Sequence, residues 1–342
     1  MPTFTSTQVK VAALTLRTSL ELDEIRGALA VDSPNHSGRD GGWRSADDTG
    51  SNINVRNGVP PQGEPSILDE VGDFPERVSA RYYFWRFDLD ENLDESDDRQ
   101  YRLDAVDVLI SEAAGDFLLL VSSQETKLSN IEHGRVTKAL LETLQGQDPE
   151  AEILPGSVLN MSRNDIYLWL TRKASVTPRP DIGAGVTVRD VAGIGAEENR
   201  RRAQSGLLRG EVDMQRVSFL SAIAEGSVLG PAYVTFAETD DKGRIWRFSA
   251  RLFLNGDFGL MLSKSAFRDL LEPEAQRLES VQRFAYRYIP MVIAAYRADT
   301  DWGTKDRDWL IIEKQLELAE RYSALARIHA RWAEYEAEQP AR

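Results

Sequence analysis

The strongest structural signal in the sequence is a run of three β-type segments over residues 232–263, joined by two short turns. In the middle segment, Trp246, Phe248, Ala250 and Leu252 alternate with polar residues, which is the period of a strand with one buried face. The second turn contains Asn255-Gly256, the pair that type I′ hairpins prefer because both central residues need positive φ. The sequence therefore predicts an antiparallel β-meander here.

Strand and helix patterns also alternate before this meander, which predicts an α+β fold with a mixed sheet in the first half. A strand near 8–16 is followed by a helix near 19–30, for which Thr18 and Glu21 form a capping-box pattern. Aromatic and aliphatic runs then predict three strands between Val78 and Ser123, a helix over 129–144 and a further strand over 165–173.

Helical spacing dominates the rest of the chain, around 197–224 and over 273–338. On a long helix from about 306 to 338, the apolar positions are Trp309, Ile312, Leu316, Ala319 and Tyr322. This helix is too polar to be stable alone, so we expect it to dock or to pair, with a homo-oligomer as one option.

Charge is distributed unevenly, which suggests two domains. The chain has 41 basic and 55 acidic side chains. Residues 1–150 hold 14 of the basic and 28 of the acidic side chains. Prolines and glycines, which interrupt helices and strands, cluster between residues 150 and 180. We therefore predict an acidic α+β domain over 1–175 and a second α+β domain over 176–342, which holds the meander 232–263 and the helices 273–338.

Residues 33–66 contain six glycines and four prolines with few apolar side chains. Such a segment buries too little apolar surface to offset the entropy of ordering, so we predict a mobile loop, with a lid over a site as the alternative.

Composition excludes several chemistries. The chain has no cysteine, so disulfides, zinc–thiolate sites and cysteine nucleophiles are absent. No secretory signal is visible, and the longest apolar run, Tyr288–Tyr296, is too short for a membrane span. We therefore expect a cytoplasmic protein, of prokaryotic type, that does not bind membranes. A net charge of −14 argues against a generic binder of polyanions.

Familiar catalytic and nucleotide motifs are missing from the sequence. There is no P-loop and no GxSxG, and the GxG pairs at 183–185 and 193–195 are isolated. Of the three histidines, His133 is the best candidate for a general base. The acidic run beginning at Asp88 has calcium-loop spacing but places Leu93 and Arg99 where Gly and Glu are needed.

One constellation does carry chemistry. Asp107 lies in a predicted strand, and Glu125 and Lys127 end the next one, where both side chains would share a face. Over about 40 residues this pattern resembles the PD-(D/E)xK nucleases. The resemblance implies that Asp107 and Glu125 bind Mg²⁺ and that Lys127 positions water or stabilises charge. The alternative is a purely structural pair of strands.

Basic residues supply a second candidate site. Arg200, Arg201, Arg202 and Arg209 are close in sequence, and Arg247 and Arg251 share one face of a predicted strand. Such clusters can contact phosphates, so we predict a nucleic-acid surface in the second half, with a solvated helix face as the alternative.

The absence of a convincing catalytic set favours a non-enzymatic binding or accessory subunit with a protein partner and no cofactor. A prokaryotic nucleic-acid-directed system such as antiphage defence, with DNA as a further ligand, is the context we hypothesise. A Mg²⁺-dependent nuclease of PD-(D/E)xK type is the alternative function.

Overall fold

The computed structural model describes residues 8–35, 37–46, 58–87, 101–124, 135–161, 163, 165–197, 206–207, 228–239, 243, 245–266 and 273–338. The chain forms two compact units, each built from two separate stretches. The first unit comprises 1–162 with 235–293, and the second comprises 163–234 with 294–342.

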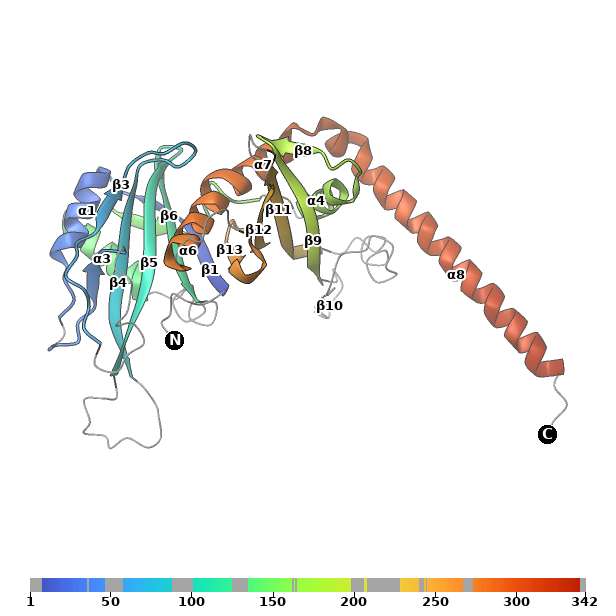
Figure 1. Cartoon of the computed structure of the whole chain (residues 1–342), viewed down its shortest axis with the longest axis horizontal. Helices are drawn as coiled ribbons and strands as arrows, with labels where there is room; N and C mark the ends of the chain where they lie inside the picture. The colour runs from blue at the N-terminus through green and yellow to red at the C-terminus, as the bar shows by residue number, and fades with distance from the viewer. Residues whose placement is uncertain are drawn as a thin grey trace. The chain divides into compact units, whose positions relative to one another are not determined.

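The first unit is built on an antiparallel sheet (Figure 1). The pairings from β12 to β2 are antiparallel, where the sequence led us to expect a mixed sheet, while the predicted α+β class is confirmed. Short strands β3 (Ser66–Leu68) and β7 (Glu152–Leu154) pair with β4 and β1. In spatial order, the strands are β11 (Val228–Thr239), β12 (Ile245–Leu252), β13 (Phe258–Met261), β1 (Gln8–Arg17), β6 (Asp116–Gln124), β5 (Tyr101–Ala113), β4 (Arg77–Phe87) and β2 (Gly42–Arg44).

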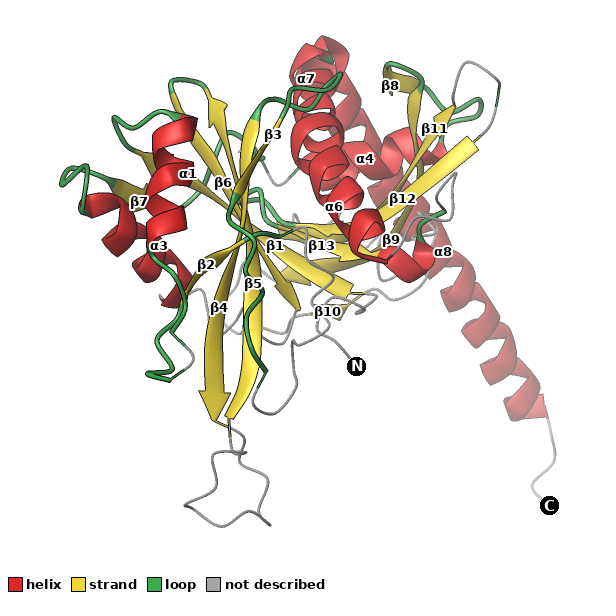
Figure 2. Ribbon diagram, turned by 60° about the vertical axis from the view of Figure 1, so that its left-hand side comes forward, coloured by secondary structure: helices red, strands yellow, loops and turns green. Residues whose placement is uncertain are grey.

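One face of this sheet packs against α1 (Leu22–Val31) and α3 (Arg135–Gln145), as Figure 2 shows. The helix α1 begins with a capping box, but it is formed by Glu21 and Glu24 rather than by the predicted Thr18 and Glu21. Trp43, on β2, is fully buried in this core. The prediction that residues 33–66 form one mobile loop is therefore wrong for the described part around Trp43, because a single large aromatic side chain anchors it.

The other face of the sheet carries α6 (Pro273–Arg283), which continues through one π-helical turn, η4 (Phe284–Tyr288), into α7 (Ile289–Ala298). Tyr288 and Phe284 pack against an aromatic group from the meander, with ring centroids 5.2–5.9 Å apart. That group consists of Phe236, Phe248 and Phe258.

The three predicted meander strands are present; β12, β13 and the part of β11 from Thr235 onward belong to the first unit. Val9 pairs with Leu260 and Val11 with Phe258, so β13 extends the N-terminal sheet directly. The division at 175/176 predicted from charge thus does not match the observed units. The physical reason is this long-range strand pairing, for which local composition carries no signal.

The turn at Asn255-Gly256 also differs from the prediction. Gly256 has φ of +90°, but Asn255 is not among the positive-φ residues, so the turn is not type I′. Instead, Gly256 N–H donates to Phe253 O, and Phe253 N–H donates to Asp257 O, which makes a longer loop between β12 and β13. A one-residue bulge with glycine in the left-handed region is a common solution for such loops.

The second unit contains α4 (Ile166–Ser175), β8 (Asp181–Gly183), β9 (Val186–Glu197), β10 (Gly206–Leu207), a π-helical turn η5 (Trp302–Asp306) and α8 (Arg307–Glu338). The prediction of a strand at 165–173 is wrong, because these residues form the helix α4. A short apolar run that is buried on all sides has no one-sided periodicity, so its sequence pattern does not distinguish a helix from a strand. For the helix predicted around 197–224, the described residues are in strands instead: β9 ends at Glu197, and β10 is Gly206–Leu207. The rest of that segment lies outside the described residues. The predicted terminal helix is confirmed as α8. None of the helices in the described part is long and apolar enough to cross a membrane.

Candidate functional site

Buried polar side chains line the sheet face of the first unit that lies opposite α1 and α3. On β4, Arg77, Ser79 and Arg81 alternate with residues of the α1 and α3 core, so they point to the second face. All three are nearly inaccessible to solvent, and α6 adds the equally buried Arg277 and Ser280. Burying a guanidinium group without partners costs free energy. The partners of these arginines therefore decide what this polar layer between the sheet and α6 can do.

Asp107 is the anion between two of these arginines. It lies directly across from Arg81 on the neighbouring strand, and Arg81 Nε donates to Asp107 Oδ1 at 2.6 Å. The other carboxylate oxygen, Oδ2, contacts Nη2 of Arg277. Burial, and next the charge of Arg81, lower the pKa of the Arg277 guanidinium well below its ordinary value. Each oxygen of Asp107 therefore already has a cationic partner.

This geometry does not favour Asp107 as a metal ligand. Mg²⁺ needs carboxylate oxygens that are available to it, and two adjacent guanidinium groups repel a cation. In the described ranges, no three His, Asp or Glu side chains are grouped so as to hold a metal. Glu125 and Lys127, the other two residues of the predicted nuclease site, lie outside the described residues, so that assignment stays a prediction.

Arg77 is held by neutral acceptors. Its Nη1 donates to the carbonyls of Asp69 and Pro75, at 3.1 and 2.7 Å, and its Nη2 donates to Gln282 Oε1 at 3.1 Å. Burial lowers the pKa of Arg77, opposed by the neighbouring groups Tyr286 and Glu279. Arg77 thus ties the segment before β4 and the helix α6 to the sheet.

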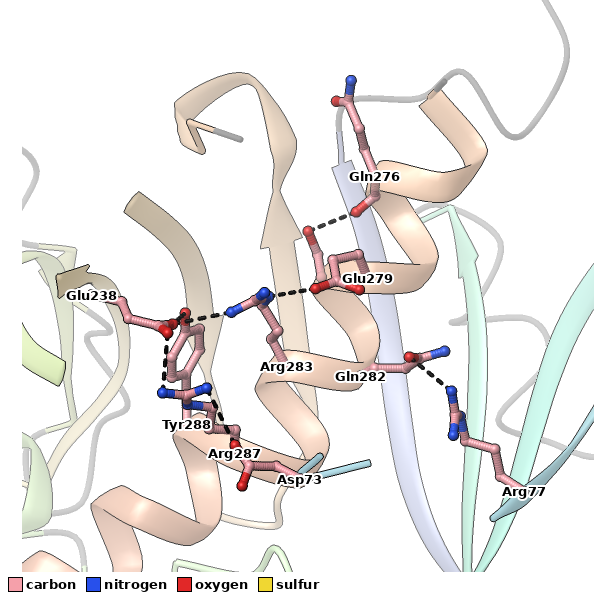
Figure 3. A network of polar contacts seen from close by, with 10 residues as sticks. Asp73, Arg77, Glu238, Gln276, Glu279, Gln282, Arg283, Arg287 and Tyr288 are labelled. Atoms are coloured by element: carbon pink, nitrogen blue, oxygen red, sulfur yellow. Dashed lines mark hydrogen bonds and ion pairs between the residues drawn. The ribbon is translucent and has the colours of Figure 1, made fainter. Parts of the chain in front are cut away.

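A second carboxylate, Glu238 on β11, is the centre of a network drawn in Figure 3. Arg283 Nη1 and Tyr288 Oη donate to Glu238 Oε2 at 3.0 and 2.9 Å, and Arg287 Nη2 lies 3.0 Å from Oε1. Arg283 also bonds Glu279 at 2.6 Å. Burial, followed by the charge of Glu238, raises the pKa of Tyr288, so its hydroxyl stays protonated and donates.

The π-helical turn is what brings these three donors together. In an α-helix of 3.6 residues per turn, Arg283 and Tyr288, five positions apart, would point about 140° away from each other. The i→i+5 pattern of η4 places residues five apart above one another, so Arg283, Arg287 and Tyr288 share the face that meets Glu238. The wide turn therefore serves to clamp α6 onto β11.

Chemically, both carboxylates are engaged by guanidinium groups, so neither is available as a metal ligand or a general base in this arrangement. The layer stabilises the helix–sheet packing. Sequence reasoning found Asp107 but missed Glu238 and its partners, which come from distant segments. The one available signal was the alternation of Arg77, Ser79 and Arg81 within an otherwise apolar aromatic strand.

The basic residues predicted to contact nucleic acid are only partly described. Arg200, Arg201, Arg202 and Arg209 lie outside the described residues. Arg247 is exposed on β12, and Arg251 is half-buried, with its guanidinium 5.0 Å from the centre of the Phe253 ring. The structure thus keeps Arg247 and Arg251 on one strand, as predicted, and leaves a nucleic-acid surface untested.

The second unit exposes apolar side chains along α8 in two rows. Leu310 and Lys314 are buried on one side of the first turns, whereas every residue from 322 to 333 is exposed. The N-terminal row, on the side away from Leu310, consists of Trp309, Ile312 and Leu316, which are 67%, 47% and 62% exposed. The C-terminal row, roughly half a turn away around the helix, consists of Leu325, Ile328 and Trp332, which are 48%, 52% and 59% exposed.

Comparison with known proteins does not add a function. No protein-family model matches the chain, and no curated protein matches it. A solved structure that aligns with it is DynU16, a protein in the dynemicin biosynthetic locus, with 12% sequence identity. The alignment covers 85% of this chain and 98% of that one, but its TM-score of 0.17 is too low to support an argument.

Proposed function

We propose that this chain is a non-enzymatic binding subunit whose helix α8 is the element that docks onto other proteins. The observation that carries the proposal is the exposure of six large apolar side chains on two sides of one helix, in the N-terminal and C-terminal rows. Soluble proteins seldom leave such rows in water unless another surface covers them. The 32-residue α8 also extends well past its buried first turns, so it has length to offer a partner.

The polar layer of the first unit supports the non-enzymatic part of the proposal. Asp107 and Glu238 are engaged by arginines that hold α6 to the sheet, so these carboxylates act in folding rather than in catalysis. An accessory role beside nucleic acid, through the arginine-rich segment, remains a prediction on which the proposal does not depend. The alternative function, a Mg²⁺-dependent nuclease, likewise stays a prediction.

The experiment is purification of the tagged full chain from its native host, identification of a stoichiometric partner, and reconstitution from purified components. We expect Leu325→Lys combined with Ile328→Lys to abolish binding of that partner, because two charges would enter an apolar contact. The matched control is Gln315→Lys, an exposed change on the same helix outside both rows.

Unchanged binding by the double variant would refute the role of α8. For the enzymatic alternative, the purified chain is incubated with plasmid and Mg²⁺ or Mn²⁺. Cleavage that disappears in Glu125→Ala would show that the chain is an enzyme and would overturn the proposal.

A further inference from the structure

We propose that the N-terminal row of α8 is covered by α8 of a second copy of this chain, packed antiparallel. This inference rests on the proposed docking role of α8 and names the occupant of one of its two rows. Along α8, the order of large and small side chains, the charges beside them and their exposure all fit such a pair.

The N-terminal row continues along the whole helix at coiled-coil spacing. Steps of three and four residues from Trp309, Ile312 and Leu316 lead to a series of small residues, which is the a/d pattern of a helix seam. All eight positions are exposed. The small residues of this seam are Ala319, Ser323, Ala326, Ala330 and Ala333. The hydroxyl of Ser323 donates to Ala319 O at 2.9 Å, so the seam contains no unsatisfied hydroxyl.

The seam has large side chains in its first half and small ones in its second, and an antiparallel copy matches the two halves. With the two-fold axis between residues 320 and 322, Trp309 lies opposite Ala333 of the second copy. Ile312 then lies opposite Ala330, and Leu316 opposite Ala326. Large side chains facing small ones fill the space between two helices evenly, as native packing requires. A parallel pair would crowd the tryptophans and leave a gap between the alanines.

Charges beside the seam fit the same register. Glu313 and Arg327 occupy equivalent flanking positions, and the antiparallel arrangement brings Glu313 of each copy next to Arg327 of the other. Both side chains are exposed, Glu313 by 64% of its side chain, and each has a partner within its own helix: Lys314 Nζ lies 3.3 Å from Glu313 Oε1, and Arg327 Nε donates to Ser323 O at 3.3 Å. Such exposed contacts are weak and can be exchanged for the pair between copies. In a single copy, 14 positions separate the two residues, so only a second copy can pair them.

Within the described part of the chain, the seam residues of α8 are exposed. The seam spans residues 309–333, a length of about 37 Å at 1.5 Å per residue. Leu310 and Lys314, which the chain itself buries, point to the opposite side of α8. The second copy therefore competes with none of the packing that the described residues make, and it leaves the C-terminal row open for a different protein.

The oligomeric state of the full chain, measured by sedimentation equilibrium, tests whether the pair exists. We expect a dimer and expect Leu316→Glu to weaken it by about 100-fold or more, because the two-fold axis places this change in the interface twice. Leu325→Glu, a matched change in the C-terminal row, should leave the dimer intact. Both residues are exposed in one copy, so folding by circular dichroism should be unchanged for both.

Cysteine pairing tests the direction, because the natural chain has no cysteine. Ile312→Cys chains mixed with Ala330→Cys chains should form a mixed disulfide, whereas Ile312→Cys alone should not cross-link. The opposite result would mean a parallel pair and would overturn the register. The charge swap Glu313→Arg with Arg327→Glu should restore a dimer that Arg327→Glu alone weakens.

A monomer at all concentrations up to about 100 µM would refute the second copy. If the partner from the native host still binds through α8 in that case, the proposed function stands and only this inference fails. If the chain is a monomer and the double variant Leu325→Lys with Ile328→Lys also binds the partner normally, both the proposed function and this inference are refuted.

Discussion

Removing the carboxylate of Asp107 should strongly destabilise the first unit. Arg81 and Arg277 are 1% and 4% exposed, and Asp107 is the anion that contacts both. In Asp107→Ala, two buried cations would lose that counter-charge. Removing one partner from a buried ion pair typically costs about 3–5 kcal/mol, and the like charges of the two arginines add to this cost. We therefore expect a loss at the upper end of that range.

The assay is native-state hydrogen exchange of the full chain, read by mass spectrometry on peptides from β4 and β5. These peptides report the opening free energy of the first unit independently of the second. The control is Asp116→Ala, because the Arg17–Asp116 pair is 3.4 Å long with side chains 53% and 37% exposed. Such a pair contributes about 0–1 kcal/mol.

A further variant separates the two arginines. Arg277→Met leaves the 2.6 Å Arg81–Asp107 bond in place and removes the like charge beside Arg81, so it should cost clearly less than Asp107→Ala. A loss below about 1 kcal/mol for Asp107→Ala would refute the reasoning, since it would mean that the carboxylate is not what keeps these guanidinium groups buried.

Three other predictions concern stability. Asp148 accepts bonds from Thr18 Oγ1 and from Ser19 N–H, both at 2.7 Å, and these hold its pKa below the ordinary value. The contribution of Asp148 to the free energy of unfolding is therefore fully present above about pH 4 and is lost as the pH falls through the lower pKa of the folded state. In Asp148→Asn, the stability measured by fluorescence should consequently fall less steeply as the pH is lowered. Gly256→Ala should cost more than Gly115→Ala in urea denaturation: both have positive φ, but only at 256 would a Cβ meet a neighbour, Leu159, at 2.9 Å. Trp43→Ala should cost about 3–5 kcal/mol by the same assay, and a loss below about 1 kcal/mol would mean that its segment is mobile after all.

The elements with clear periodicity were predictable, and those that depend on distant partners were not. Strand β1 and helix α8 follow from alternation and helical spacing in their own residues. Helix α4 was mistaken for a strand because Ile166 to Leu170 are all buried, which removes the one-sided pattern that separates the two. Trp43 was missed because one aromatic side chain among glycines and prolines changes local composition very little.

The candidate site shows the same limit. Asp107 stood out as an acid in an apolar strand, but its function depends on Arg81 across the sheet and on Arg277, which is 170 positions further along the chain. A carboxylate that binds a metal and one that neutralises arginines look alike in sequence. Only the partners distinguish them, and those partners are set by the way the chain folds back on itself.

The pairing of β13 with β1 also has a consequence for synthesis on the ribosome. Strand β1 pairs with β6 once residue 124 has emerged, but on its other edge residues 8–11 wait for β13, which is complete at Met261, the partner of Gln8. At about 5–20 residues per second, about 7 to 27 seconds separate the two events. During this interval the nascent polypeptide presents an open edge bearing Val9 and Val11, a template for pairing with a neighbouring nascent polypeptide. Chaperone shielding of the amino-terminal strand would matter most in that window.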